Sequence, residues 1–168
     1  MTAAKESLKT KIFRMGMNFF PCYRGTGGRV TFIAADFRRI RIRLPLSWRT
    51  RNIVGTIFGG SIYAATDPFY MLMLRMRLGK SYVIWDKAAS VQFLRPGRST
   101  LYAEFTLPPG EEAEIRLLLT KQPSVDRTYT VELCDENGVV HAIVQKVVYI
   151  TTQKAYAEKQ KQKQQKAA

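Results

Sequence analysis

The side chains best suited to chemistry lie between residues 52 and 67, in the stretch N-I-V-G-T-I-F-G-G-S-I-Y-A-A-T-D. Gly59 and Gly60 stand where a long apolar helix is expected to begin. The first N–H groups of a helix are free and electropositive, and glycines let a carbonyl oxygen approach them closely. Asp67 follows about two helical turns later, where a carboxylate could activate water or act as a nucleophile. Donors placed at the start of the helix could polarise a carbonyl group where an oxyanion would form.

Structural explanations of the same residues stay open. Gly59 and Gly60 could serve only to let the helix pack closely against a sheet. Asp67 could serve only to satisfy an amide freed by the following proline, or to pair with Lys87. A lone carboxylate in an apolar helix is costly unless it is paired, and this cost favours a functional role for Asp67.

The helix that would position these residues is expected from Phe58 to Leu78. Apolar side chains lie around its whole circumference, which is typical of a buried helix. Pro68 lies inside this span and predicts a bend, because proline lacks the backbone N–H donor. We therefore expect a largely inaccessible helix that bends near its middle.

Most of the remaining elements are expected to be strands. Alternating apolar residues predict them at residues 29–44, 82–94, 99–107, 127–134 and 139–152, with a short helix at 111–122. The Asn137-Gly138 step predicts a tight hairpin. Strands joined by hairpins form an antiparallel sheet, so the predicted class is α+β, with the sheet wrapped around the apolar helix. The outer side of such a helix also needs cover, which a second copy of the chain could supply across a two-fold axis.

The length and composition fit one domain. The chain has 168 residues, of which 46% are hydrophobic, enough for a real core. We expect a helical arm and loop at residues 1–28 and the main domain at residues 29–152. The Lys/Gln tail at residues 153–168 is expected to be a frayed helix or disordered.

Several classes of protein are disfavoured by the sequence. Cys22 and Cys134 are too few for a disulfide framework, which predicts a reducing, cytoplasmic setting. No apolar stretch is long enough for a membrane span and no signal-peptide pattern opens the chain, so no membrane insertion is expected. His141 is the only histidine, so we expect no metal site, and we expect this residue on the surface or pairing strands.

The net charge of +14 is concentrated in the tail and in residues 29–51. Arg39, Arg41 and Arg43 alternate with apolar residues and are expected on one face of the first strand. They could simply be solvated, or they could bind the phosphates of a ligand. Nucleic acid is not expected as a partner, because no groove-binding motif and no aromatic-plus-basic cluster is found.

The order of elements resembles the hotdog fold, in which a curved antiparallel sheet wraps a long central helix. Residues 52–67 also resemble the signature of phenylacetyl-CoA-type and related acyl-CoA thioesterases. The residues that match this signature in type and spacing are Asn52, Gly59, Gly60 and Asp67.

A second match supports this resemblance. The stretch Phe93-Leu94-Arg95-Pro96-Gly97 resembles the turn that closes the next strand in those enzymes. The resemblance spans roughly residues 29–152. It is nearest to an uncharacterised branch of the superfamily, which shares features such as Val83-Ile84-Trp85-Asp86-Lys87.

The resemblance implies an acyl-CoA thioesterase-like hydrolase whose site lies at a homodimer interface, with a dimer of dimers as an alternative assembly. Asn52 and Asp67 would be catalytic, and Phe58, Gly59 and Gly60 would contact the substrate. Coenzyme A would enter as part of the substrate, and no separate cofactor is expected. Phe58 departs from the signature, which has a histidine there. This departure keeps open a non-catalytic hotdog protein that binds acyl-CoA or a lipid-like ligand.

Asp86 and Lys87 complete the expected site. Asp86 stands where the resembling enzymes often carry a threonine or serine near the reacting carbonyl. Neighbouring residues of a regular strand point to opposite faces, so only one of the two should reach the pocket unless a bulge intervenes. Asp86 would share acid and base roles with Asp67, whereas Lys87 would neutralise Asp67 and favour binding alone.

Overall fold

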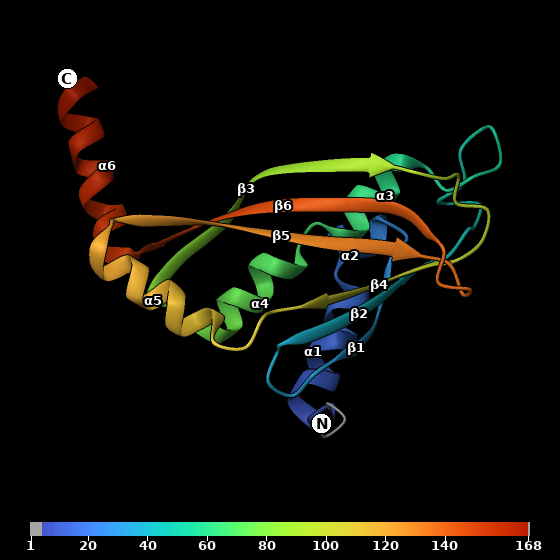
Figure 1. Cartoon of the computed structure of the whole chain (residues 1–168), viewed down its shortest axis with the longest axis horizontal. Helices are drawn as coiled ribbons and strands as arrows, with labels where there is room; N and C mark the ends of the chain where they lie inside the picture. The colour runs from blue at the N-terminus through green and yellow to red at the C-terminus, as the bar shows by residue number, and fades with distance from the viewer. Residues whose placement is uncertain (1–4, 168) are drawn as a thin grey trace.

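The computed structural model describes residues 5–167 and has an α+β architecture (Figure 1). The strands are β1 (Arg29–Ile33), β2 (Arg39–Leu44), β3 (Tyr82–Phe93), β4 (Leu101–Thr106), β5 (Ser124–Cys134) and β6 (Val140–Thr152). They form one antiparallel sheet in the order β1-β2-β4-β5-β6-β3, so β1 and β3 are its edges. The helices are α1 (Leu8–Phe19), α2 (Pro21–Gly25), α3 (Gly59–Thr66), α4 (Phe69–Leu78), α5 (Glu111–Lys121) and α6 (Gln153–Ala167).

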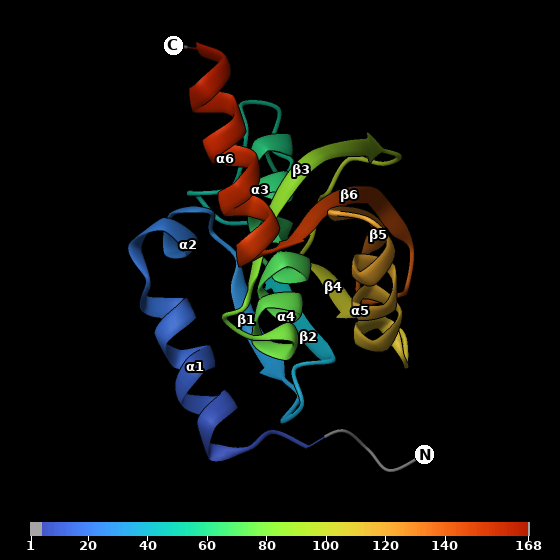
Figure 2. The same cartoon turned by 90° about the vertical axis from the view of Figure 1, so that its left-hand side faces the viewer.

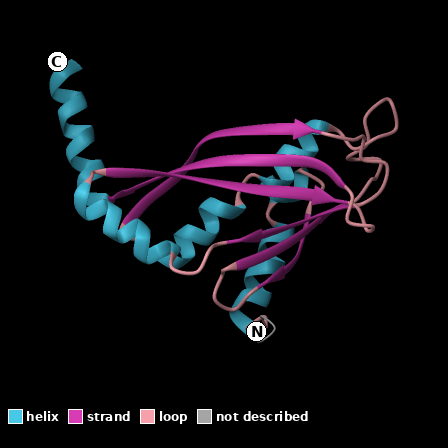
Figure 3. Ribbon diagram, viewed as in Figure 1, coloured by secondary structure: helices cyan, strands magenta, loops and turns pink. Residues whose placement is uncertain are grey.

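Helix α4 lies between α1 and α5 (Figure 2), and α1 packs against β1. The basic tail forms α6, which projects away from the rest of the molecule (Figures 1 and 3). Within residues 5–167, no helix combines the length and the hydropathy that crossing a membrane requires.

The single bent helix that we expected from Phe58 to Leu78 is instead two helices. Helix α3 ends at Thr66 and α4 begins at Phe69, with Asp67 and Pro68 between them. Proline cannot donate the hydrogen bond of a helix interior, and its ring crowds the preceding turn. The chain therefore breaks at this point, and the break carries the carboxylate of Asp67.

The prediction of a single strand from residue 29 to residue 44 is also wrong, because the chain turns back within this segment. Strands β1 and β2 form a hairpin joined through residues 34–38. Phe37 adopts a left-handed backbone with φ of 56°, and its ring is buried against Phe13 of α1. That distant contact, which no local pattern reveals, holds the turn.

The later elements follow the predictions closely. The hairpin between β5 and β6 turns at Asn137-Gly138, and Gly138 has a φ of 78°. Helix α5 lies at residues 111–121. In β2, Ile40 and Ile42 are buried while Arg41 and Arg43 are exposed, which confirms one apolar and one cationic face.

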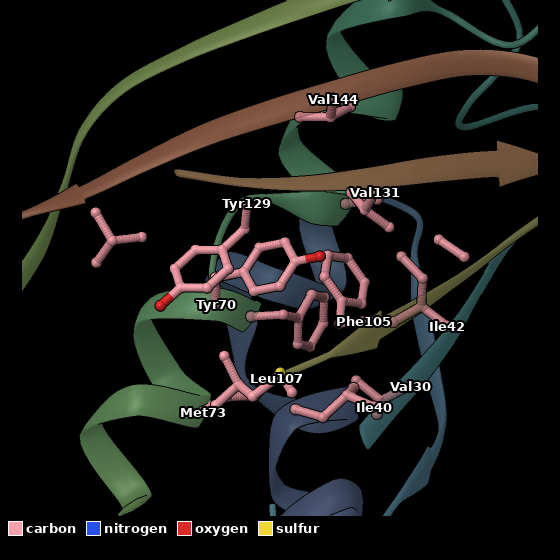
Figure 4. Packing of buried hydrophobic residues seen from close by; sticks show 14 of the residues in the cluster. Val30, Ile40, Ile42, Tyr70, Met73, Phe105, Leu107, Tyr129, Val131 and Val144 are labelled. Atoms are coloured by element: carbon pink, nitrogen blue, oxygen red, sulfur yellow. The ribbon is translucent and has the colours of Figure 1, made fainter. Parts of the chain in front are cut away.

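The core fills the space between the sheet and helices α3 and α4 (Figure 4). Tyr70 of α4 stacks on Tyr129 of β5 with ring centroids 4.6 Å apart, and Phe105 of β4 meets Tyr70 edge-on. Aromatic pairs of this kind add about 0.5–1.5 kcal/mol beyond their burial. This packing fixes the helices against the sheet and so positions the candidate site.

Candidate functional site

The candidate site centres on Lys146 of β6, whose side chain is wholly buried. Its Nζ donates to Asp67 Oδ1 at 2.7 Å and lies 2.9 Å from Asp86 Oδ2. The same Nζ lies 5.3 Å from the ring centroid of Tyr63. A buried ammonium group is costly without a partner, so the two carboxylates are what keep it charged inside the protein.

Alternation along β3 decides which of Asp86 and Lys87 joins this cluster. Asp86 is two residues from the buried Ile84 and pairs in regular register with the buried Val148, and the bulge in β3 lies only after Asp86. Lys87 points away and forms a salt bridge of 2.5 Å with Asp126. Of the two neighbouring residues, only Asp86 contacts Lys146. The lysine that pairs with Asp67 is Lys146 and not Lys87.

Burial sets the electrostatics of the cluster. Burial raises the pKa of Asp86, although the hydrogen bond to Lys146 opposes the rise and the nearby charge of Asp67 adds to it. Burial lowers the pKa of Lys146, but its hydrogen bonds to Asp67 and Asp86 outweigh that effect, so the pKa is raised overall. Oδ1 of Asp86 is buried and accepts no hydrogen bond from any described residue. The cluster therefore combines a buried carboxyl group of raised pKa at Asp86 with the carboxylate of Asp67, whose side chain is 47% exposed.

Asp67 also lines a hollow of about 250 Å³, which we call the apolar pocket. The pocket lies where α1 and α2 meet α3 and α4, and most of its wall is hydrophobic. Met17, Phe20, Met71 and Leu72 are among its lining residues. One carboxylate thus faces both an apolar hollow and a buried lysine.

The glycine half of the expected site lies elsewhere on the same chain. Gly59 lines a hollow of about 390 Å³ together with residues 93–97, so the two matched motifs do come together in space. A Cβ atom on Gly59 would lie 2.9 Å from the Phe93 ring, so close packing requires a glycine here. Phe58 caps the start of α3 and is 57% exposed. Gly60 and Asp67 are separated by about 10 Å along the chain's helical rise, too far to act on one carbonyl group together.

Asn52 is held within its own loop. Its Nδ2 donates to Thr56 Oγ1 at 2.9 Å, and its Oδ1 accepts from the backbone N–H groups of Val54 and Thr56. These contacts suit a turn residue. The catalytic role of Asn52 stays a prediction.

Of the two alternatives expected for His141, the position in a strand is the one observed, because the residue lies in β6 and its ring is buried. Its Nδ1 lies 3.0 Å from the carbonyl oxygen of Pro96, and its Nε2 lies 3.3 Å from Asp135 Oδ2. The ring therefore ties the β5–β6 hairpin to the turn at residues 93–97. Among residues 5–167, no group of three or more His, Cys, Asp or Glu side chains is arranged to hold a metal ion.

Sequence reasoning missed Lys146, although a signal was present. Val144, Lys146 and Val148 alternate along β6 and all three are buried on one face of the sheet. A lysine in register with an apolar face of a strand needs a buried partner. The pattern predicts that a carboxylate lies opposite, but not which one.

Comparisons with known proteins agree with this architecture. A probable thioesterase of unknown function from Pseudomonas aeruginosa superposes with a TM-score of 0.75 at 17% identity, covering 88% of this chain and 98% of its own. A thioesterase from Haemophilus influenzae gives a TM-score of 0.64 at 13% identity, covering 89% and 94%. Another P. aeruginosa thioesterase, solved as a mutant, gives a TM-score of 0.63 at 13% identity, covering 90% of this chain and 96% of its own. At these identities the likeness shows the fold alone, which fits a hotdog-like thioesterase fold.

Comparisons by sequence matched a family model and no curated protein. The family described as a domain of unknown function, DUF4442, matches residues 9–150, which is most of the chain. The chain therefore belongs to the DUF4442 family.

Proposed function

We propose that this protein binds an acyl thioester and hydrolyses it, with the acyl group in the apolar pocket and the reacting carbonyl beside Asp67. The observation that carries this proposal is the double position of Asp67, which lines the apolar pocket and accepts a hydrogen bond from the buried Lys146. A site for an acyl chain needs an apolar wall with few, well-placed polar groups. The thioesterase neighbours in the same fold support this chemistry by analogy.

In the proposed reaction, Asp67 takes a proton from water as the water oxygen attacks the thioester carbon. The new C–O bond forms, the C–S bond breaks, and the proton passes to the leaving sulfur. Lys146 holds Asp67 in place through Oδ1, and burial of Asp86 keeps a second acid with a raised pKa next to it.

A homodimer would complete this site. We propose that the helix N-terminus at Gly59 and Gly60 of the partner subunit polarises the carbonyl group that the water activated by Asp67 attacks, because the two groups are too far apart within one chain. Edge strand β3 supports this assembly. Its outer edge pairs with no other strand among residues 5–167, and residues 87–90 are exposed. Pairing of two β3 edges would join the sheets and remove the open edge.

The proposed setting is the cytoplasm, with coenzyme A entering as part of the substrate. Cys22 and Cys134 are free thiols, as a reducing compartment would keep them.

Binding without turnover is the second candidate. Lys146 neutralises Asp67, and Phe58 stands where the resembling enzymes carry a histidine. Both features weaken a general base. In this case the same apolar pocket would hold the acyl thioester unchanged.

Hydrolysis and binding of a panel of acyl-CoA thioesters separate the two candidates. Asp67→Asn keeps the shape of the side chain and should lower the hydrolysis rate by about 10²- to 10⁴-fold, the usual contribution of a general base. Asp126→Asn is the matched control, because Asp126 is an exposed carboxylate whose salt-bridge partner among residues 5–167 is Lys87. Hydrolysis that survives Asp67→Asn would contradict the catalytic role. Tight binding by the wild type without hydrolysis would establish the second candidate.

A further inference from the structure

A third hollow lies on the other side of α2 and is lined by arginines. It has a volume of about 400 Å³, and we call it the arginine hollow. Its charged walls are Arg24, Arg29, Arg43 and Arg49, and Trp48 stands beside them. No acidic side chain lines it, and none of these four arginines forms a salt bridge with any residue from 5 to 167.

Two neighbouring arginines have a carboxylate partner, which sets the arginine hollow apart. Arg39 and Arg41 both pair with Glu104 of β4. Of the three arginines expected to bind phosphates from β2, only Arg43 is therefore left without a carboxylate. Four unpaired guanidinium groups around one hollow repel one another, and an anion with several oxygens would relieve that repulsion.

Trp48 supplies a flat apolar surface at the same place. Its side chain is 79% exposed, and the guanidinium carbon of Arg49 lies 4.9 Å from the ring centroid. The loop that carries them is fixed by Thr50, whose Oγ1 donates to the carbonyl of Pro45 at 2.6 Å and accepts from the N–H of Ser47. An exposed indole beside cations is a surface on which a nucleobase can stack. The members of this cluster come from three separate segments of the chain, so no local pattern in the sequence reveals it.

We propose that the arginine hollow binds a phosphorylated nucleotide group, with the phosphates on the guanidinium groups and the base on Trp48. Resting on the proposed function, we assign it to the nucleotide end of the coenzyme A thioester. Helix α2 links the two sites, since Arg24 lines the arginine hollow while Cys22 and Tyr23 line the apolar pocket. One helix with its side chains is about 10–12 Å wide, which the flexible pantetheine arm of coenzyme A can cross.

A polynucleotide fits the hollow less well. Binding of a single strand needs a track of cations that follows the backbone. Here Glu104 pairs with both Arg39 and Arg41, so a carboxylate interrupts the cationic face of β2. The cationic surface is thus a local hollow, suited to one nucleotide.

Binding can be measured without any turnover. The chain has two tryptophans, so the Trp85→Phe variant leaves Trp48 as the single reporter. Coenzyme A should quench its fluorescence, and pantetheine, which lacks base and nucleotide phosphates, should not. In this background Arg43→Ala and Arg49→Ala should each weaken coenzyme A binding about tenfold, as expected for loss of a charged hydrogen bond. Arg41→Ala, an exposed arginine of the same strand face, should leave the affinity unchanged.

Unchanged coenzyme A affinity in Arg43→Ala and Arg49→Ala would overturn the assignment, as would tighter binding of a single-stranded oligonucleotide than of coenzyme A.

Paired substrates keep this result separate from the proposed function. The same two variants should raise the KM for an acyl-CoA and leave the KM for the matching acyl-pantetheine thioester unchanged. Suppose that Asp67→Asn loses hydrolysis while Arg43→Ala and Arg49→Ala change the KM of both substrates equally. This result would leave the proposed function intact and reject the arginine hollow. Quenching of Trp48 by coenzyme A in a protein that hydrolyses no thioester would support the hollow and reject hydrolysis.

Discussion

Nζ of Lys146 lies 2.7 Å from Oδ1 of Asp67, so a wholly buried lysine of the sheet is tied to the break between two helices. The contact joins β6 to the point where α3 ends and α4 begins. Since Asp86 binds the same ammonium group from β3, three elements meet at one charge. A substitution of Lys146 should therefore change both the stability and the activity of the protein.

Replacing Lys146 with methionine tests this pairing. Lys146→Met keeps the apolar stem but leaves two carboxylates without their cation, so we expect the free energy of unfolding to fall by about 2 kcal/mol. This is below the 3–5 kcal/mol typical of broken buried pairs, because Asp67 is half exposed. Urea denaturation measures the loss. The double variant Lys146→Met/Asp86→Asn should recover part of it, and a double variant no more stable than the single one would contradict the coupling.

The raised pKa of Asp86 predicts a specific dependence of stability on pH. In the folded protein the carboxyl group of Asp86 stays protonated to a higher pH than its usual pKa of 3.8 would allow, because burial disfavours the carboxylate. The contribution of Asp86 to stability is therefore fully present below pH 3.8 and is lost as the pH rises through the raised pKa. Urea unfolding of wild type and Asp86→Asn from about pH 3 to 7 should show this decline only in the wild type. Parallel curves for the two proteins would contradict the raised pKa.

Dimer formation through β3 can be followed by hydrogen–deuterium exchange. We expect a homodimer by light scattering at micromolar concentration, with the amides of residues 88–93 protected more strongly as the concentration rises. The second edge strand, β1, is the internal control, because α1 packs against it and its exchange should not depend on concentration. A stable monomer, or equal protection of β3 at all concentrations, would count against the shared site.

Two glycines make a matched pair for stability. Gly27 has a φ of 85°, and a Cβ there would lie 2.1 Å from Thr50 Cγ2, so Gly27→Ala should cost about 1–3 kcal/mol. Gly16 lies in α1 with nothing within 4 Å of the added atom, so Gly16→Ala should stabilise the protein by about 0.5–1 kcal/mol. Thermal or urea unfolding measures both. Because Gly27 lines the arginine hollow, Gly27→Ala should also weaken coenzyme A binding, whereas Gly16→Ala should not.

Features encoded by neighbouring residues could be predicted from the sequence. The Asn137-Gly138 hairpin, helix α5 and the alternation of arginine and isoleucine in β2 depend on turn chemistry and periodicity over a few positions. The family signature likewise located Asp67 as a residue of interest. Pro68 indicated a disturbance of the helix, but local rules cannot distinguish a bend from a complete break, because the packing of the following turn decides it.

The partners of the charged residues were decided only by the tertiary structure. Lys146 lies 79 residues from Asp67 in the chain, and Asp86 reaches the same ammonium group from the neighbouring strand of the sheet. The arginine hollow likewise draws its walls from residues 24–29, 43 and 48–49. A sequence pattern records which residues share a face of one element. The buried charges of this protein are paired between elements, and those pairings exist only once α3, α4 and the sheet have packed together.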